Sequence, residues 1–222
     1  MGETDLHRDM MIDLIEALRH FFADRKQVYV SGNILLYYEK GNIHRHISPD
    51  VLIGLGIPGH KRQIYKVWEE GKAPDFIIEV TSRKTRQRDR VIKKNLYQKL
   101  GVKEYLLFDP RAEYLDPRFQ VFRLENAEFV PVLAPESSGY DSPQLGLSFR
   151  VVNGTLRVFD TASNRLLPTP AEQAQRADQE AHRAEREAHR ADQEARRADR
   201  QSKRVAQLEA RLRELGVDPS SL

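Results

Sequence analysis

The sequence predicts an α/β protein with a central mixed β-sheet flanked by helices and a long, coiled-coil-like helix towards the C-terminal end. Three observations lead to this prediction: short apolar stretches separated by turn residues, one strand–helix–strand unit, and a seven-residue repeat. A length of 222 residues leaves room for one buried core and an appendage. We expect a first domain over residues 1–165, a Pro-rich linker over 166–170, the repeat helix over 171–215 and a tail over 216–222.

The first domain is expected to open with an amphipathic helix over residues 6–23, because apolar residues recur there at three- and four-residue steps. From Val28 to about Leu55, short apolar stretches are separated by the pairs Gly32-Asn33 and Gly41-Asn42, which are typical of turns. We therefore expect antiparallel strands in this region.

A buried strand and the helix after it form the centre of the predicted sheet. Residues 75–80 are a nearly continuous apolar run, as in a strand covered on both faces. A helix over 86–100, ended by Gly101, and a strand over 104–108 complete one crossover unit. Short β stretches then fill residues 119–160, with turns at Glu125-Asn126 and Asn153-Gly154.

The composition excludes several classes of protein. Because the chain has no cysteine, it has no disulfide framework, thiolate zinc site or cysteine nucleophile, and a reducing compartment is favoured. Its first residues lack the basic and apolar regions of a secretory signal, and no apolar run reaches the length of about 18 residues that a membrane span needs. We expect a cytoplasmic protein with no membrane partner. The net charge of +3 leaves room for a local basic cleft but does not indicate a DNA-coating protein.

Three polar residues stand where a buried strand and its neighbours favour apolar ones: Asp50, Glu79 and Lys93. Asp50 comes at the head of one apolar strand and Glu79 near the end of another. Adjacent strands lie about 4.8 Å apart, so two carboxylates at matching heights can chelate one hard cation. Lys93 on the following helix could then orient a water and stabilise charge that develops on a phosphate oxygen.

The segment between Glu79 and Lys93 is a basic loop that leads into a helix, which suits contact with phosphates. The residues predicted to bind phosphate are Arg83, Lys84, Arg86 and Arg88. On the helix itself, Asp89, Lys93 and Tyr97 follow one another at four-residue steps, which places them on a single face. We expect Asp89 and Tyr97 to support the lysine.

These motifs resemble the Uma-two family of restriction-type endonucleases in the PD-(D/E)XK nuclease superfamily. The resemblance is carried in order by Pro49-Asp50, by Pro74-Asp75-Phe76-Ile77-Ile78-Glu79-Val80-Thr81-Ser82, by Asp89-x-x-x-Lys93-x-x-x-Tyr97, by Gly101-Val102-Lys103-Glu104-Tyr105 and by Asp109-Pro110. The later segments Leu145-Gly146-Leu147 and Leu156-Arg157-Val158 are also similar to that family, so the resemblance covers nearly all of residues 1–170. It implies a restriction-endonuclease-like core, with Mg²⁺ (Mn²⁺ as a substitute) held by Asp50, Glu79 and the Val80 carbonyl, and attack of water on a DNA phosphodiester.

The chain departs from the superfamily pattern at the lysine. That pattern has a lysine two residues after the acid, and this position is Thr81 here. In the Uma-two family the lysine comes from the following helix, so the resemblance favours Lys93 over Lys84 or Lys94. The superfamily often adds a carboxylate from the first helix, for which Glu16 is the candidate.

Each of these residues also has a plainer interpretation. Asp50 could cap a turn after proline. Glu79 and Lys93 could form a structural ion pair, and Asp89 with Lys93 could be an ordinary pair on a helix surface. Tyr97 is more typical of packing than of chemistry. The seven histidines show no metal-ligand spacing, and we assign none of them to a metal.

The repeat helix contains a seam of alanines at alternating three- and four-residue steps, from Ala174 to Ala198. With Ala174 at heptad position a and Ala177 at d, both flanking positions e and g are acidic in the first three heptads: Asp178, Glu185, Asp192 and Glu180, Glu187, Glu194. A two-stranded homodimer in this frame would set acid against acid. We therefore expect a larger or offset homo-oligomer, or a coiled-coil partner with basic flanks, bound through 171–215. The alternative is a solvated single helix held by pairs such as Asp192 with Arg196.

Two functions remain open at this point. The first is a Mg²⁺-dependent endonuclease that hydrolyses DNA, with Asp50, Glu79 and Lys93 as its catalytic residues and the repeat helix as an assembly or partner-binding arm. The second is a catalytically inactive adaptor, whose nuclease-like domain binds nucleic acid or nothing while the arm recruits a protein partner.

Overall fold

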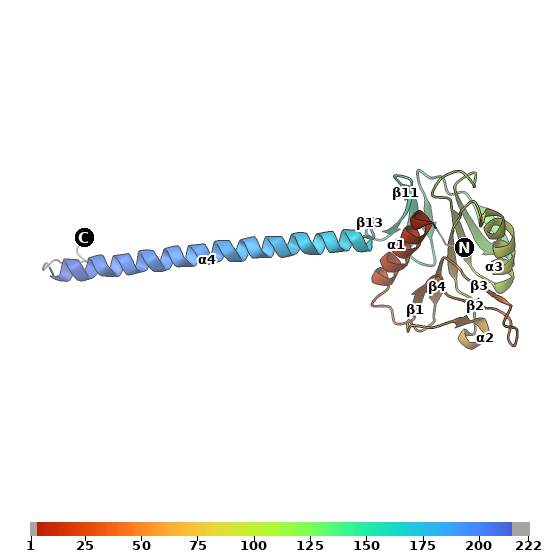
Figure 1. Ribbon diagram of the computed structural model, residues 1–222, viewed down its shortest axis with the longest axis horizontal. Coiled ribbons are helices and arrows are strands. Elements are labelled where there is room, and N and C mark those ends of the chain that lie inside the picture. Colours follow the sequence, from red (N-terminus) through yellow and green to blue (C-terminus); the bar gives the residue numbers. More distant parts are fainter. Residues whose placement is uncertain (1–3, 215–222) are drawn as a thin grey trace. The chain divides into compact units, whose positions relative to one another are not determined.

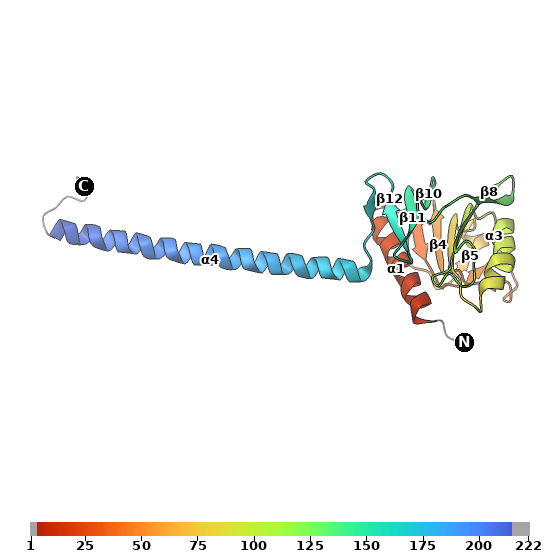
Figure 2. The same ribbon diagram turned by 90° about the horizontal axis from the view of Figure 1, so that it is seen from above.

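The computed structural model describes residues 4–214, and the chain divides into two compact units, residues 1–170 and residues 171–222. Figures 1 and 2 show the elements of each unit from two directions. The first unit is a mixed α/β domain and the second contains one long helix, α4. The predicted fold class, a mixed sheet with flanking helices followed by a long C-terminal helix, is confirmed.

The main sheet of the first unit has six strands in the order β1-β4-β6-β7-β8-β9. Neighbouring strands are antiparallel except for β6 and β7, which run parallel because a helix connects them. Their bounds are Val28–Ser31 (β1), Val51–Leu55 (β4), Phe76–Val80 (β6), Glu104–Phe108 (β7), Phe119–Glu125 (β8) and Glu128–Val132 (β9). Both β6 and β7 are buried along their whole length, as the sequence predicts for the centre of the sheet.

Two separate apolar cores cover the two faces of this sheet, because successive side chains of a strand point to opposite faces. Ile78 of β6 packs in one core with Met10 and Leu14 of helix α1 (Asp5–Phe21). Ile77 packs in the other core with Tyr97 of helix α3 (Lys94–Leu100). The two views agree that α1 and α3 lie on opposite sides of the sheet. By this alternation Glu79 points to the α3 side.

Smaller sheets complete each face. On the α3 side, β3, β2 and β5 form a three-stranded sheet beside the short helix α2; on the α1 side, a four-stranded sheet has the order β10-β11-β12-β13. The bounds are Leu36–Tyr37 (β2), His46–Ile47 (β3), Tyr65–Lys66 (β5), Val67–Glu70 (α2), Tyr140–Ser142 (β10), Leu147–Val152 (β11), Thr155–Asp160 (β12) and Arg165–Leu166 (β13). Leu167 is buried in the core of the α1 side, so the chain leaves this unit only after that residue.

The helix predicted over residues 86–100 differs from a uniform α-helix in its first half. Residues Arg88–Lys93 form a π-helix, η1, and only Lys94–Leu100 are α-helical. The Lys94 amide donates to the Asp89 carbonyl five residues earlier, and the Tyr105 hydroxyl donates to the same carbonyl at 3.0 Å. The helix ends at Gly101 in the left-handed conformation (φ 81°), as predicted.

Helix α4 runs over Pro170–Glu214, and its residues 174–211 are exposed to solvent. Ion pairs at i and i+4 join Asp192 to Arg196 and Asp199 to Lys203, both at 2.9 Å. No helix in the part of the chain that is described is long and apolar enough to cross a membrane. The predicted tail over 216–222, with Leu215, lies outside the described residues.

The backbone at Gly32 lies against the segment that leads into β4. A Cβ atom added at Gly32 would stand 2.0 Å from the Asp50 carbonyl oxygen and 2.5 Å from Cδ1 of Ile15. The next residue continues this contact, because the Asn33 amide donates to the Pro49 carbonyl at 2.8 Å. Glycine is therefore required here by close backbone approach, and it sets the position of the Pro49-Asp50 segment.

Replacing Gly32 by alanine should destabilise the protein and displace Asp50. We expect a loss of about 3 kcal/mol in the free energy of unfolding, at the upper end of the cost of overpacking, because the atom that the new methyl meets is backbone. Urea denaturation followed by circular dichroism measures it. Gly41→Ala is the control: its φ of +84° implies strain of about 1 kcal/mol, but the space around it is open. Equal losses of unfolding free energy in the two variants would contradict the requirement for glycine at position 32.

Candidate active site

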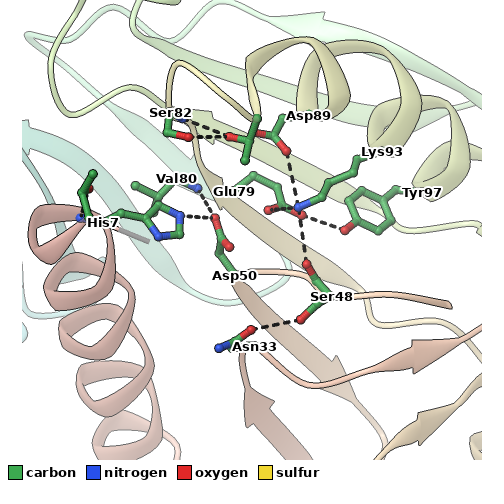
Figure 3. A network of polar contacts seen from close by, with 12 residues as sticks. His7, Asn33, Ser48, Asp50, Glu79, Val80, Ser82, Asp89, Lys93 and Tyr97 are labelled. Atoms are coloured by element: carbon green, nitrogen blue, oxygen red, sulfur yellow. Dashed lines mark hydrogen bonds and ion pairs between the residues drawn. The ribbon is translucent and has the colours of Figure 1, made fainter. Parts of the chain in front are cut away.

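Asp50 and Glu79 meet because of the pairing between β4 and β6. In this antiparallel pair Val51 lies opposite Ile78, so the residue before Val51 and the residue after Ile78 are neighbours at the end of the pair. Asp50 Oδ2 accepts a hydrogen bond from the Val80 amide at 2.8 Å, which ties the two strands together at this point. Figure 3 shows the two carboxylates with Lys93 and Tyr97.

Glu79 is fully buried, and both of its carboxylate oxygens are engaged. Lys93 Nζ donates to Oε2 at 2.6 Å, and the Tyr97 hydroxyl donates to Oε1 at 2.7 Å. Burial raises the pKa of Glu79 well above its ordinary value, and the charge of Lys93 opposes that rise. The ion pair that was the plainer interpretation of these two residues is therefore present, and Tyr97 contributes a hydrogen bond as well as packing.

Lys93 stands at the centre of this cluster. Besides Glu79, its ammonium lies 3.4 Å from Asp89 Oδ1 and 3.4 Å from the Ser48 carbonyl oxygen. Burial alone would lower the pKa of Lys93, but the negative charges of Glu79, Asp89 and Asp50 outweigh it and raise that pKa. The lysine is consequently held in its charged form.

The π-helical turn η1 carries both Asp89 and Lys93. Residues four apart lie on one face of a helix, so the two side chains reach the same region, as the sequence predicts. The carboxylate of Asp89 is buried, and neither of its oxygens has a hydrogen bond of standard geometry. Burial raises the pKa of Asp89, against the lowering effect of Lys93.

A cavity of about 430 Å³ opens above the cluster. Asp50, Asp89 and Lys93 line it, whereas the fully buried Glu79 lies beneath its lining. Of the four residues predicted to bind phosphate, Arg83, Lys84 and Arg88 line the cavity, and Arg86 is exposed but does not line it. The cavity thus joins an acidic floor to a basic rim.

Lys84, Lys93 and Lys94 are the candidates for the catalytic lysine, and they differ in their contacts. Of these, only Lys93 contacts Glu79. Lys94 places Nζ 3.7 Å from the centroid of the Phe122 ring, and Lys84 is an exposed residue of the rim. Glu16, the candidate carboxylate of the first helix, pairs with Arg19 at 2.7 Å and lines a different cavity.

Sequence reasoning missed two groups of residues at this cavity. His7 lines it and contacts Asp50 Oδ2 at 3.0 Å. Arg111 and Tyr114 line it from the loop after β7. Asp109 organises that loop, because its carboxylate accepts from the backbone amides of residues 111, 114 and 115. The pair Asp109-Pro110 was the local signal for such a loop, whereas the contact of His7 has none.

The donor set fits a hard divalent cation. The carboxylates of Asp50, Glu79 and Asp89 gather around one lysine, and carboxylate oxygens are the ligands that such a cation prefers. Each ionised carboxylate oxygen can accept more than one bond, so Glu79 keeps acceptor capacity beside Lys93 and Tyr97. Residues 4–214 contain no group of three or more histidine, aspartate or glutamate side chains arranged to hold a metal ion. A cation here would therefore need a backbone carbonyl or water among its ligands.

Comparisons with known proteins identify a family for this chain. The family Uma2, described as "Putative restriction endonuclease", matches residues 1–158. Among solved structures, a crystal structure of "a putative nuclease belonging to DUF820" from Anabaena variabilis ATCC 29413 is 17% identical, with a TM-score of 0.49, covering 65% of this chain and 76% of that chain. A comparison with curated proteins found no match.

Replacing Asp89 by asparagine should stabilise the metal-free protein at about pH 8. The pKa of Asp89 is higher in the folded protein than in the unfolded protein. The Asp89 carboxyl group therefore contributes stability below its unfolded-state pKa, and this contribution is lost as the pH rises through its folded-state pKa. Asparagine mimics the protonated form of Asp89, so the variant should have a higher Tm than the wild type, by about 2–4 °C for each kcal/mol gained in the free energy of unfolding. This gain should vanish as the pH falls towards about 4. Thermal unfolding in EDTA measures it, with the exposed Asp141→Asn as control. A lower Tm for Asp89→Asn at about pH 8 would contradict the assignment.

Proposed function

The chain belongs to the Uma2 "Putative restriction endonuclease" family, and from this premise we propose that it is a metal-dependent endonuclease that hydrolyses DNA phosphodiester bonds. One observation carries the proposal: the buried cluster of Asp50, Glu79 and Lys93 lies at the floor of a cavity with a basic rim. Acidic groups suited to a cation and basic groups suited to phosphates are thereby combined in one site.

In the proposed mechanism Asp50, Glu79 and the Val80 carbonyl would hold Mg²⁺, for which Mn²⁺ could substitute. The bound ion would supply Lewis-acid activation of the phosphate and of water. Lys93 stays charged beside Glu79, so its ammonium can orient the attacking water and stabilise negative charge that develops on a phosphate oxygen. Asp89 keeps this lysine in place, and Tyr97 holds the glutamate with which it pairs.

The basic rim would bind the substrate backbone. Arg83, Lys84 and Arg88 surround the cavity with exposed cationic side chains, and Arg86 extends the same surface. Contacts of this kind bind phosphates without reading bases, so we propose that they position DNA over the cluster rather than select a sequence.

A second function is favoured by one specific observation. Both oxygens of Glu79 already accept hydrogen bonds, as they would in a purely structural ion pair. A catalytically inactive adaptor would retain this cluster for stability and use its surfaces for binding only. The two proposals differ in whether metal-dependent cleavage exists.

For the repeat helix we propose assembly with further copies of the chain or with a protein partner. Its exposed apolar residues Val205 and Leu208 have exposed fractions of 47% and 57%. In the frame set by Ala174, Val205 continues the seam at position d, whereas Leu208 falls beside it at position g. A two-stranded homodimer in this frame would set acidic flanks against each other, so we propose a larger or offset homo-oligomer, or a partner with basic flanks.

Supercoiled plasmid should be nicked by the wild type with Mg²⁺ or Mn²⁺ and left intact in EDTA. Glu79→Ala and Lys93→Ala should each reduce the rate at least about 100-fold, because each removes a charge from the site. Lys94→Ala is the matched control and should stay within about threefold, since its ammonium lies over Phe122. Absence of nicking by the wild type would favour the adaptor, whereas nicking that persists in EDTA would contradict the proposed metal dependence.

The mass of the full chain in solution should depend on salt. Screening of the acidic flanks should favour association as sodium chloride rises from about 50 mM to about 500 mM. Multi-angle light scattering measures this. Ala184→Glu in the seam should weaken association, and Gln179→Glu on the far side of the heptad should not. A monomer at every salt concentration would exclude self-assembly.

A further inference from the structure

His7 lies far from Asp50 in the sequence, yet it contacts the site directly. It belongs to the first turn of α1, where Thr4 Oγ1 accepts from the His7 amide at 3.3 Å and so caps the helix. Its side chain is buried, and Nε2 lies 3.0 Å from Asp50 Oδ2 across a separation of 43 residues. Figure 3 shows the imidazole facing Asp50 from the helix.

Two donors converge on one oxygen of Asp50. Because an ionised carboxylate only accepts hydrogen bonds, Nε2 of His7 carries the proton and donates it to Oδ2. The Val80 amide donates to the same oxygen at 2.8 Å. Among residues 4–214, Oδ1 accepts no hydrogen bond, and Asp50 lines the cavity.

We propose that His7 is a positioning residue for Asp50: by holding Oδ2 against the protein it directs Oδ1 to the cation of the site. This inference rests on the proposed function, because the cation is part of that proposal. The Nε2 atom of His7 is committed to Asp50, so this nitrogen is not a ligand of the cation. The first helix thus contributes to the site through His7 rather than through Glu16, which lies nine residues further along α1.

The helix is well suited to hold the imidazole still. Met10, Met11 and Leu14, the next residues on its buried side, pack in the core against the sheet that carries Asp50. Burial would raise the pKa of Asp50, but the hydrogen bond from His7 and the charge of Lys93 lower it, so the carboxylate is kept ionised. Partners that orient a ligating carboxylate commonly contribute about 10–100-fold in metal affinity, which is the range expected here.

Binding of Mn²⁺ to the full chain, measured by electron paramagnetic resonance, tests the inference without relying on activity. His7→Leu removes the donor and should weaken Mn²⁺ binding about 10–100-fold. His7→Gln can still donate from its amide and should recover part of the loss. His20→Leu, an exposed histidine of the same helix, is the control and should bind like the wild type. In an Asp50→Asn background, His7→Leu should add no further loss.

Thermal unfolding in EDTA shows which variants are folded. If His7→Leu is not folded, the Mn²⁺ affinity of His7→Gln is compared with that of the wild type instead. The inference is overturned if the wild type shows no saturable Mn²⁺ binding, if His7→Leu binds within twofold of it, or if glutamine recovers nothing. Plasmid nicking by the wild type is measured in parallel. Mn²⁺ binding that depends on His7 without any nicking would reject the endonuclease proposal and leave the role of His7 standing.

Discussion

Glu79 is fully buried, and Lys93 forms an ion pair with it. An uncompensated carboxylate on the α3 side of the sheet would be costly, so the helix that supplies the lysine must lie across the end of β6. Removal of one partner from such a pair typically costs about 3–5 kcal/mol. The position of η1 and α3 over the sheet, the hydrogen bond of Tyr97 and the arrangement of Asp89 all follow from this single contact.

The π-helical turn η1 carries two of the charged groups around this contact. Asp89 and Lys93 stand four residues apart in η1, on one face, and the Lys93 ammonium pairs with both Glu79 and Asp89. The Asp89 carbonyl accepts from the Lys94 amide and also from the buried Tyr105 hydroxyl. Tyr105 stands on β7 and packs against Tyr97, so the neighbouring strand holds the turn in place.

Much of this arrangement was predictable where the signal is local. The strands β6 and β7 agree with their predicted bounds to within a residue, because strands buried on both faces are continuous apolar runs. The π turn was not predicted, and the Tyr105 hydroxyl that donates to its Asp89 carbonyl comes from another strand. The role of His7 was not predicted either, because a contact across 43 residues leaves no pattern in the chain around it. Glu16 has the expected residue type on the expected helix, but the wrong position along it.

The loop anchored by Asp109 has a consequence for how such a site can diversify. Its carboxylate is satisfied by backbone amides, which every residue type except proline provides. The side chains of Arg111 and Tyr114, which line the cavity, take no part in that anchor. The side chains at this rim can therefore be exchanged while the backbone of the loop keeps its shape, which would alter the chemistry of the cavity without altering the fold beneath it.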